Sequence, residues 1–163
     1  MPADEPSSGR AGAAVGDAAT TLHLHATPVD IRSALLRFEA DLRVAGLNAA
    51  QAGLSALVVG EALNNVAEHA LRGCPAGRIE VRAILEPGHL SVLVEDQGAP
   101  MPGLALPRGD LPDLSRDLSD LPEGGFGWHL IRALTHSLDY SRTHGRNRLR
   151  MRIMLDRLHD GVV

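Results

Sequence analysis

The sequence predicts an α+β fold, a two-layer sandwich with helices packed on one face of a mixed, mostly antiparallel sheet. Short segments of alternating apolar residues indicate strands, and they occur in adjacent pairs over 79–94 and 138–155. Two longer segments carry apolar residues at helical spacing, and they lie between the first strand and the first pair. Runs of neighbouring strands combined with paired helices are typical of a sheet covered on one face.

The N-terminal half predicts a tail, one strand and two helices. Residues 1–20 are rich in Ala, Gly, Ser and Pro and predict a disordered tail, so the folded domain is expected over 21–158. Alternating Leu and His residues predict a strand over 21–26. A Thr-Pro start and a closing glycine predict a helix over 27–46, and a capping box opens a longer one over 48–73.

The C-terminal half predicts two hairpins around a long connection. The first hairpin spans 79–94 and turns at a Pro-Gly pair. Residues 99–124 contain five prolines and five acidic residues, and we expect a functional segment such as a lid, with a short helix inside it. A glycine-rich start predicts a helix that ends near Ser137, followed by two closing strands around Gly145.

Composition excludes several classes of protein. The chain has 163 residues, enough for one domain, and its formal net charge of −4 argues against direct binding of nucleic acid. All 16 basic residues are Arg, so chemistry that needs a lysine is excluded. The single cysteine, Cys74, excludes a disulfide framework and a multi-cysteine zinc site. There is no membrane-length apolar run and no leader sequence, so we expect a cytoplasmic protein.

Three polar residues recur at four-residue spacing on the second helix. Glu61, Asn65 and His69 therefore project from one helix face. A carboxylate can orient or deprotonate a nucleophile, and an amide oxygen can ligate Mg²⁺. A solvated helix edge is the alternative interpretation.

Three further patterns could contact a nucleotide. Asp96-x-Gly98 ends a strand, where the carboxylate could accept a hydrogen bond from a purine amine, although an ordinary turn has the same residues. Gly124-Gly125-x-Gly127 opens a helix, whose exposed N–H groups suit phosphate, although a plain helix entry is the alternative. Asn147 could reach a phosphate or only close a turn.

Taken in order, these features resemble the Bergerat-type ATP site of the GHKL superfamily. Within it, the chain resembles the anti-sigma-factor serine/threonine kinases of bacterial partner-switching systems, over about residues 21–157. EALNNVAEHA resembles the N box and VEDQGAPMPG the first glycine box. GGFGWHLIRALTHSLDYSRTHGRNRLRMRI resembles the second glycine box with its closing hairpin. The resemblance implies the histidine-kinase-like ATPase fold, an ATP lid at about 99–124, and the cofactors ATP and Mg²⁺.

The resemblance also implies individual roles. Glu61 matches the catalytic base, Asn65 the Mg²⁺ ligand, and Asp96 the acceptor for the adenine amine, with Gly98 lining the base pocket. The resemblance further implies that Asn147 lies near the adenine and that the start of the next helix binds phosphate, with the residues Gly125, Phe126, Gly127, Trp128, His129 and Leu130. Because the histidines show no zinc-binding pair with a third ligand, we expect His69 to line the cofactor pocket.

The implied activity is that of an ATP-dependent serine/threonine protein kinase and anti-sigma factor. Its implied partners are a STAS-domain anti-anti-sigma protein, which it phosphorylates, a sigma factor or similar regulator, which it sequesters, and a second copy in a homodimer. Residues 99–102 replace a Phe-Asp pair of many relatives, and residues 121–123 lack the Arg that some relatives carry. These departures favour an alternative, a non-catalytic module of the same fold whose partner affinity depends on bound nucleotide. A histidine-kinase fragment is a weaker alternative, because no phosphoacceptor hairpin precedes Glu61.

Four arginines alternate along the last predicted strand and therefore share one face: Arg146, Arg148, Arg150 and Arg152. Such a face could recognise an acidic partner, and a solvated outer face is the alternative.

Overall fold

The computed structural model describes residues 19–109 and 125–155. Within these ranges the chain forms five strands and three α-helices, with one π-helical and one 3₁₀ turn between them. In chain order the elements are β1 (Ala19–His25), α1 (Pro28–Val44), α2 (Ala49–Asn65), the π-helical η1 (Val66–Ala70), β2 (Arg78–Glu86), β3 (His89–Asp96), the 3₁₀ η2 (Pro102–Leu104), α3 (Gly125–Leu134), β4 (Thr135–Thr143) and β5 (Arg146–Met154).

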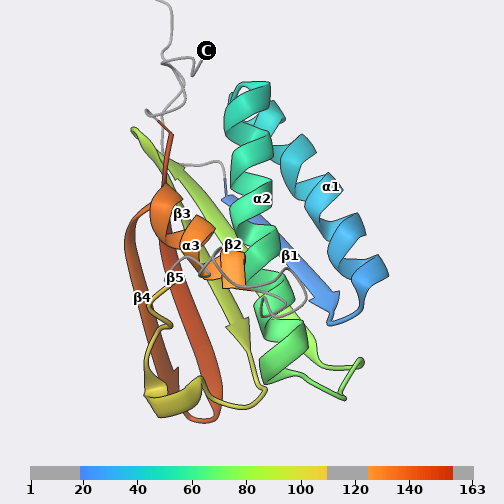
Figure 1. Cartoon of the computed structure of the whole chain (residues 1–163). Coiled ribbons are helices and arrows are strands. Elements are labelled where there is room, and N and C mark those ends of the chain that lie inside the picture. The colour runs from blue at the N-terminus through green and yellow to red at the C-terminus, as the bar shows by residue number, and fades with distance from the viewer. Residues whose placement is uncertain (1–18, 110–124, 156–163) are drawn as a thin grey trace, which may run out of the picture.

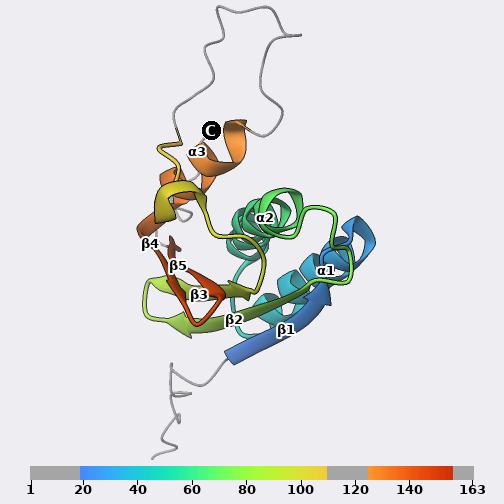
Figure 2. The ribbon, with the colours of Figure 1, turned by 90° about the horizontal axis from the view of Figure 1, so that it is seen from below.

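The strands form one sheet in the order β1-β2-β3-β5-β4, and all four pairings are antiparallel. The helices lie on one face of this sheet, as the two views in Figure 1 and Figure 2 show. The predicted α+β two-layer sandwich is therefore confirmed, although the described strands pair only antiparallel and the sheet is not mixed. Both predicted hairpins are present, and Gly145 adopts φ +76° in the second turn.

The core lies between the helices and the sheet and is mainly aliphatic. Phe38 of α1 and Leu63 of α2 are fully buried, as is Met151 of β5. The helices begin where the sequence predicts: Thr27 accepts from the backbone of Asp30, and the capping box at the start of α2 is complete.

Several helix and strand boundaries in the structure differ from the predicted ones. β1 begins at Ala19, two residues inside the expected tail, and residues 1–18 lie outside the described part. α3 ends at Leu134 rather than near Ser137, and β4 follows without a loop. Residues 135–137 belong to β4 instead, because Thr135 pairs with Ile153 of β5 and a β-branched residue suits a strand better than a helix.

Two expectations fall partly or wholly outside the described residues. The helix expected within 99–124 and most of the expected ATP lid lie in 110–124, which the structure does not describe. None of the helices in 19–109 and 125–155 is long and apolar enough to cross a membrane.

Candidate functional site

Glu61 and Asn65 lie against the first turn of α3. Asn65 donates a hydrogen bond from Nδ2 to the Glu61 carbonyl, at 2.7 Å. A Cβ placed on Gly127 would lie 2.5 Å from Glu61 Oε2 and 3.5 Å from Asn65 Nδ2. Glycine therefore lets the start of α3 approach the Glu61 carboxylate, and a side chain at this position would displace that carboxylate.

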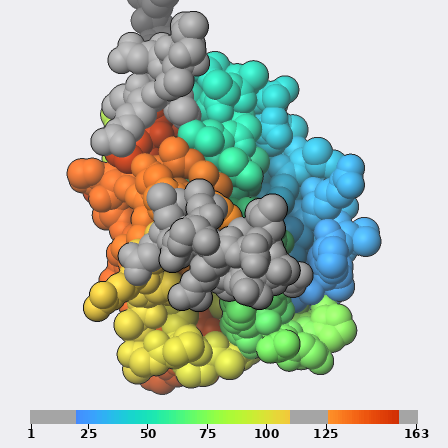
Figure 3. Space-filling model, viewed as in Figure 1, coloured from blue at the N-terminus to red at the C-terminus, as the bar shows by residue number. Residues whose placement is uncertain are grey.

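A cleft of about 280 Å³ opens at this junction. Its lining residues come from α2 and α3: Glu61, Phe126, Gly127, His129 and Leu130. Figure 3 shows α2 and α3 side by side on this surface. The first backbone N–H groups of a helix have no acceptor within the helix, and its N-terminal end is positive. The cleft therefore brings a carboxylate to the edge of an anion-binding helix start.

The donor set fits a magnesium ion that is shared with phosphates. The described residues contain no group of three or more His, Cys, Asp and Glu side chains that could hold a metal alone. Because Nδ2 of Asn65 is engaged with the helix backbone, its Oδ1 remains as an oxygen ligand. Mg²⁺ commonly takes one or two protein oxygens and completes its coordination with phosphates and water.

Asp96 closes β3 with a buried carboxylate that is 5 % exposed. Its Oδ1 accepts from the Gly98 backbone N–H at 2.7 Å and from Asn147 Nδ2 at 2.8 Å. Burial raises the pKa of Asp96, and the hydrogen bonds from Asn147 and Gly98 and the charge of Arg142 oppose this shift. No hydrogen bond within the described residues uses Oδ2, so this oxygen can accept from a ligand.

Asn147 has a fixed amide orientation. Its Oδ1 accepts from the Tyr140 hydroxyl at 2.7 Å and from Arg142 Nη1 at 2.5 Å. Its Nδ2 must then point to acceptors, and it donates to Asp96 and to the Ala99 carbonyl. Asn147 lies opposite both Asp96 on β3 and Arg142 on β4, so the sheet register assembles this network.

Tyr140 and Arg142 also hold the chain that follows β3. The Met101 backbone N–H donates to the Tyr140 hydroxyl at 3.0 Å, and Arg142 Nη1 donates to the Gly98 carbonyl at 2.9 Å. Neither residue was predicted from the sequence. Tyr140 and Arg142 follow Leu138 at intervals of two residues, so all three lie on the strand face that points towards the helices. This alternation was the sequence signal that could have identified them.

Gly98 joins the end of η1 to this network. The Ala99 N–H donates to the Ala70 carbonyl at 2.8 Å, and a Cβ on Gly98 would overlap that carbonyl.

The π-helical turn η1 is a type of turn that occurs frequently at functional sites. This turn also changes the position of His69. Because hydrogen bonds in η1 span five residues, a residue four positions after Asn65 no longer lies one α-helical turn further on. His69 is exposed and does not line the small cleft.

The segment before residue 110 packs on α3. Arg132 donates to the Pro107 carbonyl at 2.9 and 2.6 Å, and His129 Nδ1 lies 3.3 Å from the Gly109 carbonyl. Trp128 is 9 % exposed and points into the core, whereas Phe126 at the small cleft is 51 % exposed. Among the residues expected to bind phosphate, Phe126, His129 and Leu130 therefore line the small cleft, whereas the Trp128 side chain does not.

A wider cleft of about 1140 Å³ lies beside β1 and the start of α1. It shares only Asp96 with the predicted site residues. The structure thus brings Glu61, Asn65 and Gly127 into one group and Asp96, Gly98 and Asn147 into another. Within a single chain, α2 and η1 connect the two groups.

Comparison with known proteins gives concordant results. Residues 24–153 match the model of the histidine kinase-like ATPase domain. The serine/threonine-protein kinase BtrW of Bordetella bronchiseptica is 35 % identical over 94 residues, which cover 57 % of this chain and 63 % of that protein.

Two solved structures are also similar. The RsbU and RsbW domains of Rv1364c from Mycobacterium tuberculosis superpose with a TM-score of 0.57 at 18 % identity, over 83 % of this chain and 32 % of that one. The blue-light activated histidine kinase EL346 of Erythrobacter litoralis gives a TM-score of 0.46 at 23 % identity, over 69 % and 33 % of the two chains. The family match covers nearly all of the described residues, and the chain therefore belongs to the histidine kinase-like ATPase domain family.

Proposed function

We propose that this protein is an ATP-dependent serine/threonine kinase of a partner-switching system. The observation that carries the proposal is the junction of Glu61 and Asn65 with Gly127 at the start of α3. It places a carboxylate and an amide oxygen beside a helix N-terminus, which suits the phosphates of a nucleotide. The base would then lie near Asp96, whose Oδ2 accepts from an exocyclic amine.

Each residue has a distinct task in this proposal. Glu61 accepts the proton of a serine or threonine hydroxyl as that oxygen bonds to the γ-phosphorus, and the bond to the β–γ bridging oxygen breaks to release ADP. Asn65 would hold Mg²⁺, and a bound Mg²⁺ would neutralise charge on the phosphates. The backbone N–H groups at the start of α3 orient the transferred group.

The proposed protein substrate is a STAS-domain anti-anti-sigma protein, and the proposed sequestered partner is a sigma factor or similar regulator. Support comes from the similarity to BtrW, which is a serine/threonine-protein kinase, and this chain spans 63 % of that relative. The similarity to a structure that includes an RsbW domain supports the fold. Homodimerisation stays part of the proposal.

The test is phosphotransfer measured by intact mass. The full chain, Mg²⁺-ATP and each STAS-domain protein of the same genome would be mixed, with Glu61→Ala as the control. A single added phosphate on one STAS protein, absent with the variant, supports the kinase. Tight ATP binding without phosphate on any partner would instead establish the second candidate, a nucleotide-gated binding module, which the sequence departures at 99–102 and 121–123 favour.

A further inference from the structure

The sheet has a second face that no described helix covers. Figure 2 shows α1, α2 and α3 on the other side. Along β2, β3 and β5, residues alternate between the buried side and this open face. The open face is defined here by its charged residues, six arginines and four carboxylates: Arg78, Arg82, Arg146, Arg148, Arg150 and Arg152; Glu80, Glu86, Glu95 and Asp139. Its formal charge is thus +2, whereas the chain carries −4.

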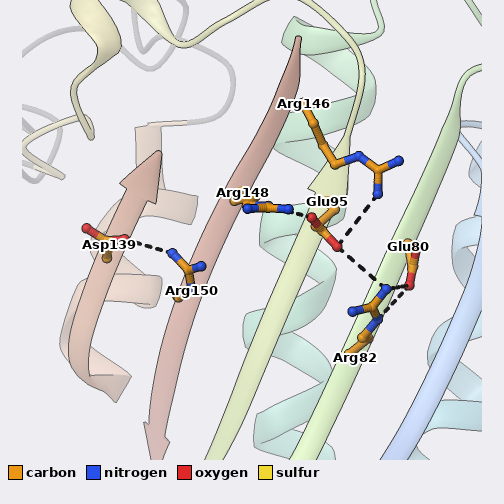
Figure 4. Close-up of polar contacts among 7 residues, drawn as sticks. All are labelled: Glu80, Arg82, Glu95, Asp139, Arg146, Arg148 and Arg150. Carbon is orange, nitrogen blue, oxygen red and sulfur yellow. Dashed lines mark hydrogen bonds and ion pairs between the residues drawn. The ribbon is translucent and has the colours of Figure 1, made fainter. Parts of the chain in front are cut away.

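Glu95 forms ion pairs with three of these arginines, as Figure 4 shows. Its side chain is only 5 % exposed although it lies on the open face, because arginine side chains cover it. Arg148 Nε lies 2.7 Å from Oε1, and the Arg146 and Arg82 guanidinium groups each approach Oε2 to 3.9 Å. Arg82 also pairs with Glu80 at 2.5 Å, so two carboxylates face three guanidinium groups and one positive charge remains at the surface.

The arginines of β5 form a regular and accessible row. The side chains of Arg146, Arg148 and Arg150 are 40 %, 39 % and 53 % exposed. Alternate residues on one strand lie about 6.6 Å apart, so the row presents cations at that spacing. Within the described part of the chain, the ion-pair partner of Arg150 is the exposed Asp139 at 3.4 Å, and an exposed ion pair of this kind contributes little.

Apolar side chains accompany this row. Leu93 lies in register between Arg82 and Arg150, and Ile84 is 44 % exposed on the same face. Arginines around apolar residues are typical of the centre of protein–protein interfaces.

We propose that the open face docks an acidic segment of a partner protein, whose carboxylates pair with the β5 arginines. Arginine matches carboxylate geometry with two parallel hydrogen bonds. The carboxylates on the face and the negative chain would repel a uniform polyanion such as DNA or an anionic membrane. This surface lies on the opposite side of the sheet from the proposed nucleotide site and does not depend on it.

The test uses a fluorescein-labelled peptide that alternates Glu with Thr, and binding is followed by anisotropy. The variant Arg150→Glu/Arg152→Glu leaves the buried Glu95 contacts intact. The matched control, Arg32→Glu/Arg37→Glu, makes the same charge change at exposed positions of α1. We expect the β5 variant to weaken peptide binding at least about tenfold and the control to change it less than about twofold.

Calorimetric ATP binding by each variant checks that the fold is retained, whether or not phosphotransfer is found. Equal weakening by both variants would overturn the proposal, because net charge alone would then explain binding. So would an absence of peptide binding by the wild type, or tighter binding of single-stranded DNA or anionic vesicles through the same arginines. Self-association that only the β5 variant abolishes, measured by sedimentation, would assign the face to a second copy and also contradict it.

Discussion

Asn147 donates a hydrogen bond to Asp96 across the β3–β5 pairing, at 2.8 Å, and both residues are buried. Tyr140 and Arg142 fix the direction of this bond, because both donate to the amide oxygen of Asn147. One Asp96 oxygen is thereby occupied by protein donors, and the other remains for a ligand.

Removal of the Asn147 amide should damage both stability and base binding. Asn147→Leu leaves buried donors and acceptors of Asp96, Tyr140 and Arg142 without their partner, and each such loss costs about 1–3 kcal/mol. We expect a decrease of at least about 2 kcal/mol in the free energy of unfolding, measured with urea. Asn64→Leu, at an exposed position of α2, serves as the control. Unchanged stability of the Asn147 variant would contradict the network.

Asp96→Asn should keep the fold and weaken ATP binding. An amide keeps the acceptor for Gly98 and Asn147 but replaces the second oxygen with a donor. Loss of a hydrogen bond to a charged group costs about 1.5–3 kcal/mol, so we expect at least about tenfold weaker binding by calorimetry. Wild-type affinity in this variant would exclude Asp96 from base recognition.

The same variant reveals the pH dependence of stability. Because burial raises the pKa of Asp96 above its ordinary 3.8, the folded chain holds this proton more tightly than the unfolded chain. The stabilising contribution of this carboxyl is fully present below pH 3.8 and is lost as the pH rises through the folded pKa. The unfolding free energy of wild type minus that of Asp96→Asn should therefore fall as pH increases from this value. A difference that rises with pH would mean that the pKa is lowered.

Glu61→Gln should abolish phosphotransfer while leaving ATP bound. The amide is nearly isosteric but accepts no proton, and loss of a general base typically slows a reaction by about 10²–10⁴-fold. The measurement compares single-turnover transfer with calorimetric ATP affinity. Full transfer by the variant would remove Glu61 from the base role, whereas loss of ATP binding would indicate a structural effect.

Gly127→Ala should displace the Glu61 carboxylate from the start of α3. The new methyl group would lie 2.5 Å from Glu61 Oε2, so the carboxylate must rotate away from its position beside the helix start. We expect a greater loss of transfer than Gly53→Ala causes, because the position of Gly53 has room for a methyl group with its nearest atom at 4.0 Å. Equal activity of the two variants would argue against the close approach.

Ser55→Ala should stabilise the protein. The Ser55 hydroxyl is fully buried in α2 and has no hydrogen-bond partner within the described residues. Its removal relieves an unsatisfied polar group and improves helix propensity, worth about 1 kcal/mol. Thermal unfolding of both proteins provides the measurement, and a lowered midpoint would show that the hydroxyl has a partner in solution.

Local patterns predicted much of this fold. The Asn48–Gln51 capping box and the alternation over β2 and β3 lie within short stretches of sequence, and the structure confirms both. The end of α3 was predicted too late because its residues are compatible with a helix until pairing with Ile153 is considered. That pairing joins residues far apart in sequence, which periodicity does not reveal.

In the candidate site, too, the features that depend on local sequence were predicted and those that depend on strand register or helix type were not. Glu61 and Asn65 lie one α-helical turn apart as expected, and Asp96 ends a strand. The π-helical turn that exposes His69 was not predicted, because α- and π-helical turns have no distinct apolar pattern. Tyr140 and Arg142 were missed because their role depends on the register of β4 against β5.

The absence of a loop between α3 and β4 makes chain length critical at one point of the molecule. Residues that line the small cleft and residues that hold Asn147 belong to one uninterrupted stretch, and a register shift between Thr135 and Ser137 already adjusts its alignment with β5. One residue inserted after this irregularity would turn Tyr140 and Arg142 towards the opposite face of the sheet. Insertions and deletions should therefore be tolerated far less here than in the turn at His144 and Gly145, and a deletion scan across both places would map this difference.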